Sequence, residues 1–138
     1  MSKNKFYSES FKVYLVDTCC YGNATYISYH KWISIAKENF FLTEVAGFSD
    51  YFFKQGIKLI VLENHIKIAK ELKLHDNVTV TVRCKQLKKL KLYLQYQLLN
   101  NEGEIVAEGE DKITFVDSNN GIVIIPDKID QALKKILI

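Results

Sequence analysis

One long helical pattern in the first third of the chain most constrains the fold. From Ile27 onward, apolar residues recur at helical spacing on one side, and Gly47 is a plausible stop for the helix. The apolar positions are Tyr29, Trp32, Ile33, Ala36 and Phe40. Segments with strand-like alternation follow, so a sheet has to cover this apolar face. The sequence therefore predicts one α+β domain over residues 1–138.

Alternating apolar and polar residues predict the strands. They span residues 11–16, 57–69, 78–84, 90–98, 105–116 and 122–125, and a short terminal helix spans 127–137. Within 57–69 the inward set moves from odd to even positions, as a bulge would allow. Both faces of that strand begin apolar, which suggests a central place in the sheet. The 78–84 and 90–98 strands should pair as a hairpin, and the segment from Gly47 to Gly56 should be a loop.

Composition and cysteine spacing exclude several classes of protein. No apolar run approaches the ~20 residues of a membrane helix, and no apolar segment follows the basic N-terminus, so we expect a cytoplasmic protein with no membrane partner. The 3 Cys and 3 His residues lack metal-ligand or Cys-x-x-Cys spacing, which predicts no metal, no cofactor and no disulfide framework. A net charge of +3 is too small to indicate nucleic-acid binding.

Residues 16–32 lead from an extended run through a turn at Gly22 directly into the predicted helix. The first N–H groups of a helix lack intrahelical acceptors and share the positive end of the macrodipole. A carbonyl oxygen placed against them is polarised without any charged side chain, which is half of a hydrolase site. An ordinary helix start without a ligand is the alternative.

The same segment resembles the entry to the central helix in hotdog-fold acyl thioesterases of the 4-hydroxybenzoyl-CoA thioesterase superfamily. The matching residues are Gly22, Ser28-Tyr29 and Trp32, with His30-Lys31 continuing the pattern. Most members carry a catalytic Asp three residues before the Gly, where this chain has Cys19. The departure is most similar to the enediyne-polyketide type, in which that position is also not acidic and a Gly-Asn pair resembling Gly22-Asn23 follows.

The resemblance implies a fold and a substrate. The fold would be the hotdog, an antiparallel sheet wrapped around one long central helix. The substrate would be an acyl thioester of coenzyme A or of an acyl carrier protein, here in polyketide biosynthesis. The resemblance also implies a homodimer or homotetramer with active sites between subunits.

The resemblance further assigns roles to residues. The backbone N–H of Tyr26 would polarise the thioester carbonyl, and Gly22 would let the turn approach closely. Asn23 and the region of Cys19 would position the attacking water. The acyl chain would lie along the helix against Tyr29, Trp32, Ile33 and Ala36. Lys37 falls where enediyne-type enzymes carry a positive charge, so it would anchor a polar acyl group or the oxyanion, unless it is merely a solvated helix lysine.

The missing carboxylate leaves three hypotheses for the base. In the first, Cys19 only fills the vacated position, and backbone and polar groups hold the water. In the second, Cys19 is a nucleophile, which requires a thiolate. In the third, Asp17 is the base, because alternating side chains of an extended strand put positions 17 and 19 on one face. A turn or capping role for Asp17 is the simpler interpretation.

Basic residues crowd the predicted hairpin end, at Arg83, Lys85, Lys88, Lys89 and Lys91. They would attract the phosphates of coenzyme A or the acidic helix of an acyl carrier protein. Lysines that only keep a hairpin tip soluble are the plainer account.

A hotdog hydratase would need an acidic residue paired with a histidine near the helix start, where this chain has only His30. We therefore expect a thioesterase, and the alternative is a non-catalytic acyl-binding or assembly module that kept the fold.

Overall fold

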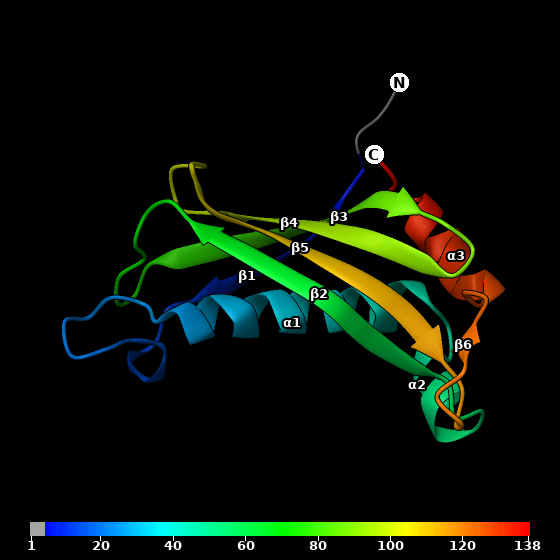
Figure 1. The fold of residues 1–138 in the computed structure, drawn as a ribbon. Helices are drawn as coiled ribbons and strands as arrows, with labels where there is room; N and C mark the ends of the chain where they lie inside the picture. Colours follow the sequence, from blue (N-terminus) through cyan, green and yellow to red (C-terminus); the bar gives the residue numbers. More distant parts are fainter. Residues whose placement is uncertain (1–4) are drawn as a thin grey trace.

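The structure, a computed structural model that describes residues 5–138, is an antiparallel sheet curved around one long helix (Figure 1). In chain order the elements are β1 (Tyr7–Lys12), the 3-10 turn η1 (Leu15–Asp17), α1 (Tyr26–Glu44), α2 (Phe48–Phe53), β2 (Lys58–Ile68), β3 (Asn77–Leu87), β4 (Lys91–Leu99), β5 (Ile105–Val116), β6 (Ile122–Val123) and α3 (Asp127–Lys134). The strand order is β1-β3-β4-β5-β2, and β6 pairs with β5. This arrangement confirms the predicted hotdog fold.

The inner face of α1 forms the centre of the core, as its helical spacing predicts. The buried positions of the helix include Tyr29, Trp32, Ile33, Ala36, Phe40 and Phe41, and they pack against inward side chains of the sheet. Burying each large apolar side chain contributes about 1.5–3 kcal/mol. The helix ends at Glu44, shortly before Gly47, whose φ of 71° lies in the left-handed region that glycine favours.

The predicted bulge in β2 is confirmed, but its predicted central place is wrong. The pairing of β2 with β5 shifts register between Val61 and Glu63. β2 lies at one edge of the described sheet, and Val61, Leu62 and Ile68 are exposed. A strand that is apolar on both faces is therefore uncovered at an edge, which is unusual for an isolated subunit.

The first strand lies earlier in the chain than predicted. β1 ends at Lys12, and the chain then tightens into η1 where the alternation predicted continued extension. Leu15 and Val16 are 74% and 86% exposed, so their apolar spacing does not report burial in this subunit. The side chain of Asp17 accepts a hydrogen bond from the Tyr14 N–H at 2.9 Å and closes the turn. The expected loop after Gly47 also contains a short helix, α2.

Candidate active site

A tight hairpin precedes α1 and gathers three of the predicted site residues. The Cys19 N–H donates to the Asn23 carbonyl at 2.9 Å, and the Gly22 N–H donates to the Cys19 carbonyl at the same distance. Gly22 has a φ of 80°, which an L side chain adopts only with strain. The turn therefore holds Cys19, Gly22 and Asn23 together immediately before the helix.

The connection between β2 and β3 anchors this hairpin from below. The Leu74 N–H donates to the Gly22 carbonyl at 2.9 Å, and the Ala24 N–H donates to the Leu72 carbonyl at 2.7 Å. The hydroxyl of Tyr29 accepts from the Leu72 N–H at 3.1 Å. The entry to α1 is thus fixed to a segment far away in the sequence.

The first turn of α1 leaves a backbone amide without an acceptor among the described residues. The Ser28 N–H is satisfied by Thr25, and the Ser28 hydroxyl donates to the Asp17 carbonyl at 2.9 Å. The N–H of Tyr26 has no acceptor within residues 5–138. The Tyr26 residue is 67% exposed, so this amide lies near the surface at the positive end of a 19-residue helix. Its predicted role as a carbonyl polariser stays a prediction.

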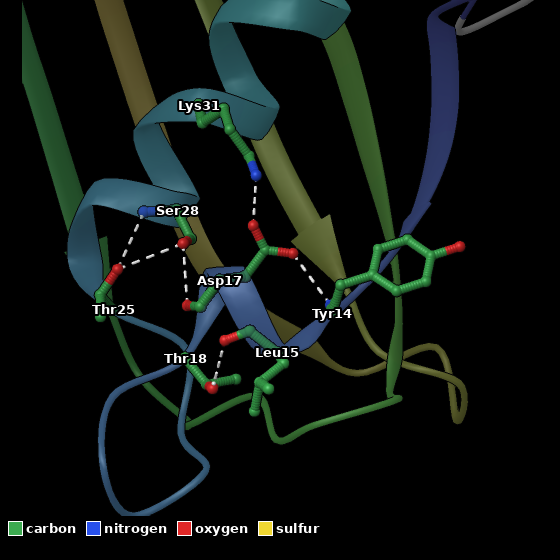
Figure 2. Close-up of polar contacts among 7 residues, drawn as sticks. All are labelled: Tyr14, Leu15, Asp17, Thr18, Thr25, Ser28 and Lys31. Atoms are coloured by element: carbon green, nitrogen blue, oxygen red, sulfur yellow. Dashed lines mark hydrogen bonds and ion pairs between the residues drawn. The ribbon is translucent and has the colours of Figure 1, made fainter.

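Asp17 is buried, and both oxygens of its carboxylate are already bonded to other groups of the same chain. One carboxylate oxygen pairs with the Lys31 ammonium and the other accepts from the Tyr14 N–H (Figure 2). The premise that Asp17 and Cys19 share one face of a strand is wrong, because Asp17 ends a 3-10 turn. Asp17 therefore links η1 to α1, and it would have to leave Lys31 before it could take a proton from water.

Cys19 and Cys20 are exposed, whereas Cys84 is buried. Neither Cys19 nor Asn23 makes a side-chain hydrogen bond to the described part of the chain. His30 contacts the Tyr26 ring edge-on, with the centroids 6.5 Å apart. Both polar side chains of the turn are therefore free to contact a ligand or a water.

The aromatic face predicted to carry the acyl chain is closed in the subunit. Tyr29, Trp32 and Ile33 are almost fully buried beneath the sheet. The expectation of an acyl chain against them is corrected in this respect, because an acyl chain would have to displace core side chains. Their burial follows from the same helical spacing by which the sequence predicts an apolar face on the helix.

An apolar cavity lies instead at the other end of α1. Its volume is about 400 Å³. The lining includes Leu42, Phe48, Phe52, Phe53, Ile57 and Leu59. The sequence analysis did not predict this cavity, since α2 occupies a segment without clear periodicity. A run of four aromatic residues between Phe48 and Phe53 was the available signal.

Lys37 belongs to a buried polar network between α1 and the sheet. Its Nζ lies 3.1 Å from Oδ2 of Asp111, and the Tyr96 hydroxyl donates to the same oxygen at 2.7 Å. Asn64 donates to Oδ1 at 2.6 Å. Burial raises the pKa of Tyr96 well above its usual range, and the neighbouring Asp111 charge raises it further. Lys37 is about 16 Å along the helix axis from Tyr26, so one subunit does not bring the two together.

The sequence contained a signal for this network that the prediction missed. Asp111 interrupts the inward-facing positions of β5, between Gly109 and Ile113. A charged residue at an inward position of a strand needs partners, which Lys37 and Tyr96 supply.

Residues 5–138 contain no group of three or more His, Cys, Asp or Glu side chains arranged to hold a metal ion. Across the same residues, no helix has the length and apolar character needed to cross a bilayer.

Known proteins share both the sequence pattern and the fold. The family model of the thioesterase-like superfamily matches residues 16–133, whereas no curated protein sequence matches the chain. A Staphylococcus aureus protein solved in complex with CoA is 15% identical, with a TM-score of 0.90 over 99% of this chain and 86% of that one. The dynemicin thioesterase is 16% identical, with a TM-score of 0.90 over 97% and 99% of the two chains.

A third similar structure is the 1,4-dihydroxy-2-naphthoyl-CoA thioesterase from Synechocystis. It is 14% identical, with a TM-score of 0.84 over 94% of this chain and 96% of that one. Such low identities establish the fold, and the match of the family model over most of the chain establishes the family. The chain belongs to the thioesterase-like superfamily.

Proposed function

We propose that this protein hydrolyses an acyl thioester of coenzyme A or of an acyl carrier protein, with the oxyanion held by the Tyr26 N–H. The observation that carries the proposal is the exposed helix-start amide without an acceptor in residues 5–138, in a chain of the thioesterase-like superfamily. Water adds to the carbonyl carbon, and the oxygen that becomes negative lies against the amide and the helix dipole. The carbon–sulfur bond then breaks, and the thiolate leaves and takes up a proton.

The turn before the helix holds the attacking water. Asn23 and the backbone around Cys19 supply polar groups there, and Gly22 leaves room for the substrate, since an added Cβ would meet no atom within 4 Å. No carboxylate stands at position 19. Turnover is therefore modest, because a well-placed general base contributes about 10²–10⁴-fold.

The active site lies between two subunits. β2 exposes apolar residues along an uncovered edge, and a second copy that pairs antiparallel with it buries Val61 and Ile68. β2 starts at the α2 end of the subunit and finishes at the end where α1 begins (Figure 1). An antiparallel copy therefore brings the start of its α1 to the apolar cavity of the first subunit. The protein works as a homodimer, and two dimers can associate further into a homotetramer.

The cavity of one subunit then receives the acyl chain whose thioester lies at Tyr26 of the other. Its aromatic lining suits an extended, conjugated chain of the polyketide type, and the dynemicin thioesterase, of similar fold, is described as binding a polyene. Lys37 precedes Glu38 and Leu42 on α1, and both of these residues line the cavity. Asp111 takes one of its N–H groups, which leaves the others to bind a polar substituent of the chain.

Free thiol release tests the hydrolase directly. The protein is incubated with a panel of acyl-CoA and acyl-carrier-protein thioesters, and the new thiol is titrated against a no-enzyme control. Release with turnover is the expected result. Tight binding of the same thioesters without release would contradict it and favour the second candidate, a non-catalytic acyl-binding module. The engagement of Asp17 with Lys31 and the absence of a carboxylate at position 19 are the observations that favour that candidate.

A further inference from the structure

An apolar groove ringed by lysines lies at the end of the sheet where β3 turns into β4. Its floor contains Leu62, Leu90 and Ile122, all of them at least about half exposed. Its rim contains Lys88, Lys89, Lys91 and Lys112, and its volume is about 500 Å³. We call these seven residues the lysine-rimmed groove. Apolar surface enclosed by charge is typical of a protein-binding site.

A second groove continues around the same turn. It is also lined by Lys88 and Lys89, has a volume of about 510 Å³ and adds Leu87, Ile124, Ile125 and Leu137. Its acidic residues are Asp127 and Asp130, and Asp130 pairs with Lys134 at 2.9 Å. The two grooves together give an elongated aliphatic surface on both sides of the Lys88-Lys89 turn.

The positive charge of the rim is largely uncompensated. Within residues 5–138, Lys88, Lys89 and Lys91 form no ion pair, and Lys112 reaches Glu63 only at 3.5 Å. Clustered cations of this kind attract a partner of opposite charge and raise its rate of association.

We propose that the lysine-rimmed groove docks an acidic amphipathic helix of the protein that carries the acyl group. The apolar face of that helix lies on Leu62, Leu90 and Ile122, and its carboxylates face Lys88 and Lys89. This inference rests on the proposed thioesterase function and selects a carrier protein over free coenzyme A as the source of substrate. A nucleotide fits the surface less well, because the lining of both grooves has no aromatic ring on which adenine could stack.

The position of the groove agrees with delivery of a thioester to the proposed dimer. Leu62 belongs to β2, so the groove borders the edge at which the second copy pairs. The start of the partner's α1 comes to this same end of the sheet. A carrier protein docked here therefore stands next to the site formed with the partner and not at the distant end of its own subunit.

Charge reversal at the rim tests the inference. The octanoyl thioester of an acyl carrier protein and octanoyl-CoA are compared as substrates of the wild-type protein and of the double variant Lys88→Glu/Lys89→Glu. We expect kcat/KM for the carrier-protein substrate to fall about tenfold or more, with a salt-sensitive loss, while kcat/KM for octanoyl-CoA changes less than about twofold. The matched control is Lys5→Glu/Lys12→Glu, which reverses one lysine shortly before β1 and one at its last position, at the other edge of the sheet, and leaves both values unchanged.

Three results would overturn the inference. Equal losses of kcat/KM on both substrates would show that the lysines bind coenzyme A. No loss on either substrate would show that the lysines have no part in docking. Binding to anionic lipid vesicles that the double variant loses, with carrier-protein turnover unchanged, would assign the groove to a membrane surface. If the wild-type protein hydrolyses neither substrate, the proposed function fails by itself. Titration of the carrier protein against wild type and double variant then still decides whether the groove binds it.

Discussion

Lys37 on α1 and Asp111 on β5 form an ion pair, 3.1 Å long, beneath the sheet. The Asp111 side chain is 2% exposed and the Lys37 side chain 14%, so water solvates neither charge well. A buried pair of this kind adds little net stability, but loss of one partner leaves the other charge uncompensated. The pair therefore makes each residue dependent on the other.

Asp111→Ala should lower the free energy of unfolding by about 3–5 kcal/mol, because the Lys37 charge and the Tyr96 hydroxyl lose their acceptor. Urea denaturation followed by circular dichroism measures the change. The double variant Lys37→Met/Asp111→Leu should recover much of the loss, since no charge stays buried. A single-variant cost below about 1 kcal/mol would show that the pair is solvated.

Tyr26→Pro should reduce kcat for thioester hydrolysis about 10²–10³-fold, because proline has no N–H to stabilise the oxyanion. The helix should survive, since Tyr26 is its first residue, where proline is favoured, and Thr25 already has the extended ψ of 156° that a following proline requires. Steady-state kinetics and thermal melts measure the two effects. Tyr26→Phe is the control, because it keeps the amide. Full activity in the proline variant would rule out this amide as the oxyanion donor.

Cys19→Ser should retain hydrolysis within about tenfold, because the proposed mechanism attacks with water and forms no covalent intermediate. Iodoacetamide should modify Cys19 and Cys20 in the native protein at neutral pH, whereas Cys84 should react only after unfolding. Peptide mass spectrometry identifies the labelled sites. Loss of turnover in Cys19→Ser, with Cys20→Ser unaffected, would instead establish the covalent route.

Asp17→Asn should leave the hydrolytic rate nearly unchanged at temperatures where the variant is folded, because the carboxylate serves Lys31 and the Tyr14 N–H. Asp17→Ala should destabilise the fold by about 1–3 kcal/mol, since the part-buried Tyr14 N–H loses its acceptor and Lys31 loses its partner. Melting curves and rates are measured on the same samples. An Asn variant that melts normally yet hydrolyses nothing would identify Asp17 as the base.

Stability should fall between about pH 9 and pH 11 through Cys84. Burial raises the pKa of this thiol from 9.0 to about 11, so the folded state holds the proton more tightly than the unfolded state. The contribution is complete below pH 9 and is lost as pH rises through 11, by at most about 2–3 kcal/mol. Urea titrations across this range should therefore be flatter for Cys84→Ala than for wild type. Parallel curves for the two proteins would contradict the prediction.

Much of the fold was predictable because its signals are local. The periodicity of residues 27–46 identified α1, and the change from odd to even apolar positions located the bulge in β2. The predicted end of the first strand was wrong at Leu15 and Val16, because apolar alternation indicates burial without saying whether the covering surface belongs to the same subunit. The apolar faces of β2 led to a wrong prediction for the same reason, since they indicated a central strand where β2 lies at an edge of the described sheet.

The candidate site was predictable only where it is continuous in the sequence. Cys19, Gly22, Asn23 and Tyr26 lie within one turn and the first residue of the helix, so spacing alone placed them together. Asp111, the partner of Lys37, and its other donors Asn64 and Tyr96 come from three different strands, and no local sequence pattern indicates which strand lies above which helical turn. These contacts could be predicted only with knowledge of the strand register.

In the proposed dimer, the anchoring of the Gly22 hairpin by Leu72 and Leu74 would tie thioester hydrolysis to protein concentration. Both residues belong to the connection that follows β2, so fraying of that strand in a lone protomer would loosen the amides at the start of α1. Dilution that separates the two copies would then lower specific activity in two ways. It would disorder the amide proposed to stabilise the oxyanion, and it would remove the acyl-chain cavity that the partner subunit supplies. In a cell, the abundance of the enzyme would set its activity per molecule as well as its total output.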